Sequence, residues 1–200
     1  MSDVLATCLA VDTNVLLDLA DEVDDVLDAA GVIDDRLPDA AKLVPPSVLE
    51  ELAYLADSGL TPKIRQSAGR IVQLLRKETR FRPILELPVA PEKAAELAAA
   101  FRRQRLLPGE EIHDSLILAE TALLDCDILL TSDEHLRSID HQQLTWVLSQ
   151  HELSPPVIAT PAKLSASFSG SAEETVASTP DYSSGNEVQR NFPFPCQTFP

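Results

Sequence analysis

Residues 113–136 read HDSLILAETALLDCDILLTSDEHL, a helical pattern followed by an apolar run that ends in an acidic turn. The apolar positions up to Leu124 recur with helical spacing, which predicts a helix over 110–124. The run DILLTSD (127–133) is continuously apolar before its polar end, as is typical of a strand buried on both faces of a parallel sheet. A helix followed by a buried strand is the repeating unit of an α/β fold.

The same alternation extends outward from this stretch. Further strands are predicted at VLATCLAV (4–11), AKLVPP (41–46), PILELPV (83–89) and LTWVLS (144–149). Helices are predicted over 14–30, 48–57, 62–78 and 91–105. Strands that alternate with helices predict an α/β sandwich around a parallel sheet.

The composition changes near the end of the chain. From about Ser165 onward, Ser, Pro, Thr, Gly and Asn dominate and the apolar periodicity is lost. We therefore expect a domain over 1–164 and a disordered tail over 165–200. The last ten residues, NFPFPCQTFP, hold three of the six phenylalanines; they could form a short docking motif, but an extension without function is favoured.

The chain lacks the signals of membrane insertion and of a disulfide framework. No apolar run reaches the ~18 residues that a membrane helix needs, and the N-terminus has no basic segment typical of a secretory signal. The three cysteines, Cys8, Cys126 and Cys196, are far apart in sequence and form no C-x-x-C pair. This usage fits a reducing cytoplasm, with Cys8 and Cys126 as small buried apolar residues.

The net charge of −16 argues against nucleic acid when taken alone, because phosphate binding relies on Lys and Arg. The basic residues are unevenly placed, however: 11 of the 16 lie between Lys63 and Arg105. One basic flank is therefore predicted, and the alternative is that these charges only solvate a helix face. The candidate RNA-binding residues in this flank are Lys63, Arg65, Arg70 and Arg76.

Acidic residues occupy positions where the predicted elements begin or end. Asp12 and Asp133 each follow a predicted strand, at the edge of a parallel sheet where ligands bind. Glu51 and Asp114 lie near the starts of two predicted helices, whose N-termini favour negative charge. If both helices begin at that sheet edge, the four carboxylates converge and repel one another unless a cation lies among them.

Each of these residues also has a structural interpretation. Asp12 and Asp133 could cap helices, and Asp114 could be a solvated helix residue. Ser47 and Glu50 match a capping box in which Glu50 bonds back to the Ser47 amide, which leaves Glu51 as the favoured ligand and Glu50 as the alternative.

The donor types favour hard cations. Oxygen ligands without a spaced histidine set suit Mg²⁺ or Mn²⁺ rather than zinc. Such an ion can orient and activate a water for attack on a phosphodiester. The histidines are expected to be surface residues, although His113 and His135 neighbour Asp114 and Asp133 and could approach phosphate.

Four segments, taken in order, resemble a PIN domain of the VapC-type toxins. They are AVDTNVLLDL (10–19), VPPSVLEELAYL (44–55), HDSLILAETALLDCDILLTSDEHL (113–136) and VIATPAKL (157–164), and the resemblance covers roughly 5–165. It implies a three-layer sandwich with a twisted, mainly parallel central sheet. The tail and the acidic net charge depart from the family pattern.

The resemblance also implies a site and an activity. The family's acidic positions fall on Asp12, Glu51, Asp114 and Asp133, and its supporting polar groups on Asn14 and on Thr131 or Ser132. It implies Mg²⁺- or Mn²⁺-dependent cleavage of single-stranded RNA by a cytoplasmic endoribonuclease. A small antitoxin protein and a second copy of the chain are the partners it suggests, with the predicted hairpin of helices 48–57 and 62–78 as the surface.

Two other functions compete with this interpretation. A non-catalytic PIN scaffold for protein or RNA docking is the main alternative. A phosphatase that uses Asp12 as nucleophile is disfavoured, because such enzymes need an acid two residues later, where this chain has Asn14.

Overall fold

The computed structural model describes residues 7–77 and 79–169 and contains a five-stranded parallel sheet. The strand order is β3-β2-β1-β4-β5, so β1 lies at the centre between β2 and β4. The strands are β1 (Cys8–Val11), β2 (Ala41–Val44), β3 (Arg82–Pro83), β4 (Ile128–Leu130) and β5 (Val157–Ala159). The prediction of a mainly parallel α/β fold is confirmed.

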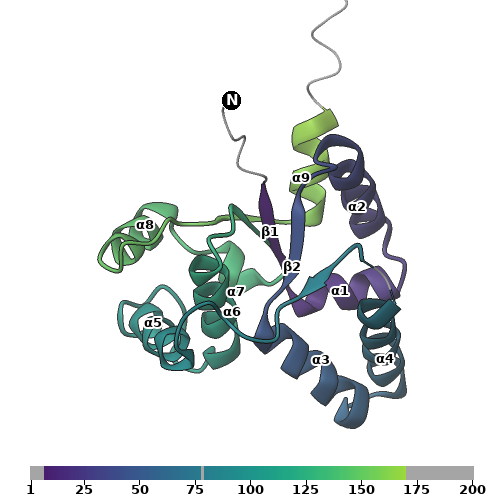
Figure 1. Cartoon of the computed structure of the whole chain (residues 1–200), viewed down its shortest axis with the longest axis horizontal. Helices are drawn as coiled ribbons and strands as arrows, with labels where there is room; N and C mark the ends of the chain where they lie inside the picture. The colour runs from purple at the N-terminus through teal and green to yellow at the C-terminus, as the bar shows by residue number, and fades with distance from the viewer. Residues whose placement is uncertain (1–6, 78, 170–200) are drawn as a thin grey trace, which may run out of the picture.

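Helices cover both faces of the sheet and the edge at which its strands end (Figure 1). In Figure 1, α2 and α9 lie on one side of β1 and β2, and α5 to α8 lie on the other, while α1, α3 and α4 gather below the strands. The described helices are α1 (Thr13–Ala20), α2 (Asp24–Arg36), α3 (Pro46–Ser58), α4 (Pro62–Lys77), α5 (Pro91–Arg103), α6 (Ile112–Leu123), α7 (Glu134–Arg137), α8 (His141–Ser149) and α9 (Pro161–Ser169).

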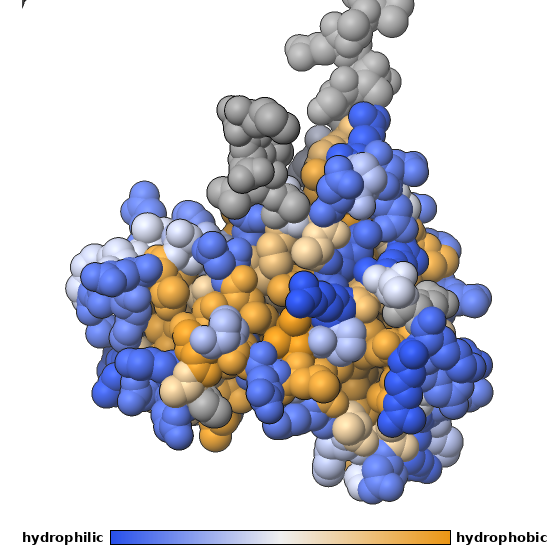
Figure 2. All heavy atoms as spheres, viewed as in Figure 1, coloured by the Kyte–Doolittle hydropathy of each residue, from blue (hydrophilic) through white to orange (hydrophobic). Residues whose placement is uncertain are grey.

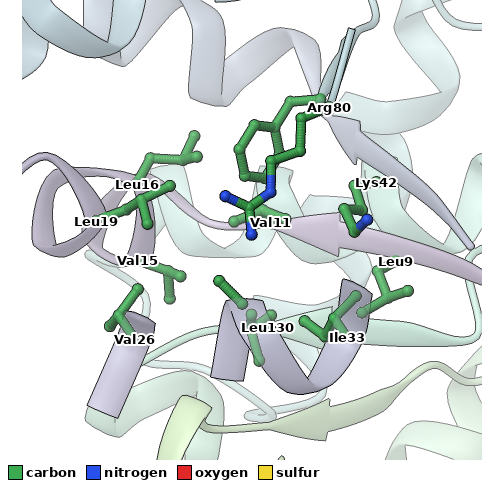
Figure 3. A pocket seen from close by; sticks show the side chains of 12 residues that line it. Leu9, Val11, Val15, Leu16, Leu19, Val26, Ile33, Lys42, Arg80 and Leu130 are labelled. Atoms are coloured by element: carbon green, nitrogen blue, oxygen red, sulfur yellow. The ribbon is translucent and has the colours of Figure 1, made fainter. Parts of the chain in front are cut away.

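The core on the α2 side is apolar and holds a small cavity of about 30 Å³ (Figure 3). Figure 3 shows Val26 and Ile33 of α2 on one side of this space and the guanidinium of Arg80 reaching toward it from another. Arg80 and Lys42 both pair with Asp34 of α2, at 2.6 and 2.7 Å. This charge cluster fastens α2 to β2 and to the segment before β3, and it fixes the helix against the sheet.

The segment 144–149 is a helix rather than the predicted strand. Leu144, Val147 and Leu148 are buried at helical spacing, and Trp146 between them is exposed. Asp140 caps α8 by accepting a hydrogen bond from the Gln143 amide at 2.8 Å. The β-favouring Thr, Trp and Val of this segment are overridden by packing of one helical face.

Two other predicted elements have different extents in the structure. The strand expected over 83–89 is only Arg82–Pro83, and the following residues form bends that carry the exposed Leu85. The helix expected over 14–30 is two helices, α1 and α2, separated by a turn at Glu22 with φ of 57°. The fifth strand, β5, was not among the predicted strands.

Helix α9 continues past the predicted domain boundary. Helix α9 extends to Ser169 and packs on α2, with Leu164 buried in the core and Phe168 against it. The remainder of the predicted tail, 170–200, lies outside the described residues. Among the described helices, none combines the length and apolarity needed to cross a membrane.

The face shown in Figure 2 is divided by polarity. An apolar area crosses its middle, and hydrophilic surface lies over α5 and α8 on one side and over α2 and α4 on the other. A hollow lies between α3, α5 and α6. Its apolar lining includes Leu85, Leu87 and Val89, and its acidic lining consists of Glu50, Glu86 and Glu120.

Candidate functional site

The site begins where the two central strands end. Val11 of β1 pairs with Leu130 of β4, so the next residues, Asp12 and Thr131, leave the sheet side by side. The Thr131 hydroxyl donates to Asp12 Oδ2 at 2.6 Å, and both side chains are buried. Asp12 also caps α1, since its Oδ1 accepts from the Thr13 amide at 2.6 Å. The predicted capping role and the predicted position at the sheet edge therefore coexist in one residue.

A polar network behind Asp12 connects the two strand ends. Asn14 donates weakly to the Thr131 hydroxyl at 3.5 Å, and its carbonyl oxygen accepts from the Ser132 amide at 3.1 Å. The Asp133 amide donates to the same Thr131 hydroxyl at 3.0 Å, and Asp133 Oδ1 accepts from Leu136 to cap α7. Thr131 is thus the hydroxyl that contacts Asp12, while Ser132 enters the network through its backbone.

Burial makes ionisation of Asp12 costly. Only 3% of the residue is exposed, and desolvation raises its pKa to about 6. The hydrogen bonds from Thr131 and Thr13 lower the pKa, and the charges of Glu51 and Asp133 raise it. A buried carboxylate beside two others is a position that an added cation would stabilise.

Glu51 reaches this cluster from the second turn of α3. Its Oε2 lies 2.8 Å from Nε2 of His113 in α6. Burial raises the Glu51 pKa, but the polar contacts with His113 and Thr13 outweigh it and hold the pKa below its ordinary value. The pKa of His113 is raised in turn, mainly by Glu51. Glu50, the alternative ligand, is exposed on α3 and lines the hollow between α3, α5 and α6 instead.

The predicted capping box at the start of α3 is wrong. The Ser47 amide and hydroxyl both donate to Glu120 Oε2 of α6, at 3.0 and 2.6 Å. Helix α3 has Pro45 as its N-cap and begins at Pro46, so Ser47 is its second residue and not its cap. Glu120 therefore takes the role expected of Glu50, and it ties α3 to the helix that carries Asp114.

Asp114 lies in the first turn of α6 and faces the other acids. Its pKa is raised to about 7, first by desolvation and then by the charges of Asp133, Asp12 and Glu111. Donor atoms of Glu111, Asp114 and His135 all lie within 4.8 Å of one another, which is a grouping able to hold a metal ion. Glu111 and His135 are 3.2 Å apart.

The four predicted acids lie toward the edge where the central strands end. Of these four, only Asp114 belongs to the donor grouping found among the described residues, and its partners there are Glu111 and His135. Glu111 was not among the predicted site residues, and His135 is exposed as expected and lies beside Glu111 and Asp114. The signal for Glu111 was its position three residues before Asp114, one helical turn away, and that for His135 its position two residues after Asp133.

The predicted RNA-binding cations all lie on α4, which packs against α1 and α3. Lys63 pairs with Asp21 at 2.8 Å, Arg65 donates to the Gly59 carbonyl, and Arg70 donates to the Ala20 carbonyl at 3.3 Å. Arg76 is exposed in the last turn of α4. The contacts of Lys63 and Arg70 lie at the end of α1, whereas that of Arg65 lies at the end of α3.

An open parallel sheet with clustered carboxylates where its central strands end is the architecture of a PIN-type fold. The sequence of residues 9–142 matches the family described as PIN domain. The chain belongs to this family.

One solved structure illustrates the shared fold. The chain is similar to a chain in the crystal structure of VapBC2 from Rickettsia felis bound to a DNA fragment from their promoter, with a TM-score of 0.52 and 14% sequence identity. The similarity covers 77% of this chain and 98% of that one. A comparison with curated proteins found no match.

Proposed function

We propose that this chain is a metal-dependent endoribonuclease that hydrolyses phosphodiester bonds in single-stranded RNA in the cytoplasm. The observation that carries the proposal is the gathering of acidic side chains where β1 and β4 end. Burial is the main cause that raises the pKa values of Asp12 and Asp114, and the charges of neighbouring acids add to it. Proteins retain such repelling charges where a cation or a reaction uses them.

The donor set fits a divalent cation. Asp12, Glu51, Asp114 and Asp133 offer hard oxygen ligands of the kind that Mg²⁺ and Mn²⁺ prefer. A bound cation supplies charge neutralisation at the scissile phosphate and a water of lowered pKa. Thr131 holds Asp12 in one orientation through its 2.6 Å hydrogen bond. Asn14 and the Ser132 amide fix the loop that carries Asp133.

The RNA backbone is expected to approach from α4. Lys63, Arg65, Arg70 and Arg76 give this helix a basic exposed side in a chain whose net charge is −16. Helix α4 contacts α1, the helix that Asp12 caps. The acids by themselves repel an RNA backbone. Cations on the neighbouring helix α4 would attract the phosphates and direct the RNA toward the acids.

The hairpin of α3 and α4 is the proposed docking surface for a small antitoxin protein. Tyr54 and Leu60 are 65% and 96% exposed there, whereas Ile71 of α4 is buried in the core. The structurally similar chain comes from a structure of VapBC2 bound to a DNA fragment from their promoter. A second copy of this chain is the other occupant that the same apolar surface would accept.

Asp12→Asn tests the nuclease proposal. Asn keeps an acceptor for the Thr13 amide but removes the charge, so we expect loss of Mn²⁺-dependent cleavage of single-stranded RNA with a folded, thermally stable protein. Undiminished cleavage by purified Asp12→Asn would place the activity elsewhere or in a contaminant. A wild-type protein that binds RNA but cuts none with Mg²⁺ or Mn²⁺ would instead support the scaffold alternative.

Coexpression with any small reading frame found beside the gene tests the antitoxin proposal. We expect a stable complex with inhibited cleavage, and Leu60→Lys should weaken the complex while leaving free cleavage unchanged. If no neighbouring product copurifies, the antitoxin proposal fails and the nuclease proposal stands.

A further inference from the structure

Two thiols meet at the end of the sheet opposite the candidate site. Cys8 is the first residue of β1, and Cys126 lies in the short link between α6 and β4. Their Sγ atoms are 2.8 Å apart although 118 positions separate them in sequence. That separation is less than 1 Å longer than the covalent S–S bond of about 2.05 Å. Both are free cysteines here.

The backbone on both sides of the thiols is already fixed. The Asp127 amide donates to the Cys8 carbonyl at 2.9 Å, and the Cys8 amide donates to Asp127 Oδ2 at 2.8 Å. The Cys126 amide donates to the Thr121 carbonyl at 3.2 Å. A bond between the two sulfurs therefore requires only a small side-chain movement, with β1 and β4 kept in register.

The two thiols differ in access and reactivity. Cys8 is half-buried, whereas Cys126 is buried. The Cys126 thiol, through its contact with Cys8, lowers the pKa of Cys8, while the same contact and burial raise the pKa of Cys126. The more accessible thiol is thus the one that more readily forms a thiolate, which is the nucleophilic form.

We propose that Cys8 and Cys126 form a reversible disulfide that locks β1 to β4, with a small-molecule disulfide such as oxidised glutathione as the oxidant. Cys8 thiolate attacks one sulfur of the oxidant and displaces a glutathione thiolate, which leaves a mixed disulfide on Cys8. Cys126 then loses its proton and attacks the Cys8 sulfur, displacing the second glutathione. The protein loses two electrons and two protons, and oxidised glutathione gains them as two thiols.

The bond would act on the strands whose other ends carry the site. Asp12 follows β1 and Thr131 follows β4, so both stand on the two strands that the disulfide joins. Closing a loop of this length constrains the unfolded chain strongly. A reversible disulfide is also the form expected in a reducing compartment, where such bonds are transient and redox-sensing.

The test uses the full chain with Cys196→Ser, so that only the two paired thiols remain. The protein is equilibrated with reduced and oxidised glutathione at graded ratios and denatured in the presence of N-ethylmaleimide. Its intact mass is then measured by mass spectrometry. We expect conversion from two alkylated thiols to a species with none, lighter than the reduced chain by two hydrogen atoms. Peptide mapping should find Cys8 linked to Cys126.

Thermal unfolding provides the second readout. Oxidation should raise the melting temperature by roughly 10 °C. The matched control, Cys126→Ala in the same background, should stop at the mixed disulfide on Cys8 and show no such rise. Two alkylated thiols at every ratio, or a glutathione adduct that persists on Cys8 when Cys126 is present, would overturn the proposal.

Discussion

Glu120 of α6 caps helix α3 from a distance of 73 positions in sequence, because its Oε2 accepts from both the amide and the hydroxyl of Ser47. Ser47 is only 1% exposed, so its two donors rely on Glu120, whose side chain also borders the hollow between α3, α5 and α6. The contact fixes the start of α3, and therefore Glu51, relative to the helix that bears Asp114. A single buried carboxylate thus sets the relative positions of two of the four candidate ligands.

Glu120→Ala is expected to destabilise the protein by about 1–3 kcal/mol, because it leaves the buried Ser47 amide and hydroxyl without an acceptor. Glu120→Gln keeps an acceptor and should lose less. Chemical denaturation followed by circular dichroism measures both. Glu50→Ala, on the exposed side of α3, is the control and should change the free energy of unfolding by less than ~0.5 kcal/mol. Equal losses for Glu120→Ala and Glu50→Ala would contradict the capping role.

Thr131→Val should impair the site more than Ser132→Ala. The Thr131 hydroxyl donates to Asp12 and accepts from the Asp133 amide, whereas Ser132 contributes its backbone amide to the network. We expect Thr131→Val to weaken Mn²⁺ binding by roughly 10-fold or more, measured by calorimetry, because it frees the Asp12 side chain to reorient. Ser132→Ala should bind Mn²⁺ like the wild type. The reverse order would mean that the second hydroxyl orients the ligands.

The metal-free protein should become less stable as the pH rises from 5 to 8. The folded-state pKa of Asp12, about 6, and that of Asp114, about 7, both exceed their ordinary value of 3.8. The folded state therefore holds these protons more tightly, so the stability they contribute is complete below pH 3.8 and is lost as the pH rises through 6 and 7. His113, whose pKa is also raised, titrates in the same direction.

The expected fall over this range is on the order of 2 kcal/mol. Thermal unfolding in a chelator measures it, and two changes should reduce it. Asp12→Asn removes one of the titrating groups, and saturating Mg²⁺ competes with the protons, so the metal should stabilise the protein more at pH 8 than at pH 5. A flat profile in the metal-free protein would contradict the burial of these acids.

His135 should tune the choice of metal. Its imidazole lies with Glu111 and Asp114 in one donor group, and nitrogen ligands favour Mn²⁺ over Mg²⁺. His135→Ala is expected to weaken Mn²⁺ binding about 10-fold and Mg²⁺ binding much less. His151→Ala, a histidine distant from the acids in sequence, serves as the control. If His135→Ala weakens Mn²⁺ and Mg²⁺ binding equally, the imidazole does not select the metal, and its role is limited to its contact with Glu111.

Local patterns predicted β1, β2 and β4, the middle of the sheet, because most of their residues are apolar, whereas β3 is shorter than expected and β5 was not predicted. Asp12 and Asp133 each follow one of these strands. Their placement at one edge of the sheet could be predicted because parallel strands have their carboxyl ends at the same edge. The segment 144–149 was predicted wrongly because its β-favouring composition outweighed the helical spacing of Leu144, Val147 and Leu148.

Other features depend on contacts that no local pattern contains. Ser47 matched a capping box with Glu50, and nothing near it in sequence indicated that Glu120 would take both donors. The contact between Cys8 and Cys126 was equally hidden, because their separation in sequence argued against pairing. It follows only from the register that places Leu9 beside Ile128.

The outer strands of the sheet limit how this molecule can associate. Strand β3 ends at Pro83, which has no amide to donate, and β5 begins directly after Pro156 and is followed two residues later by Pro161. Neither margin offers the long row of open backbone groups on which an extra strand could grow. Edge-to-edge pairing through the described strands is therefore disfavoured, and an assembly built from the described residues would use side chains on the helices.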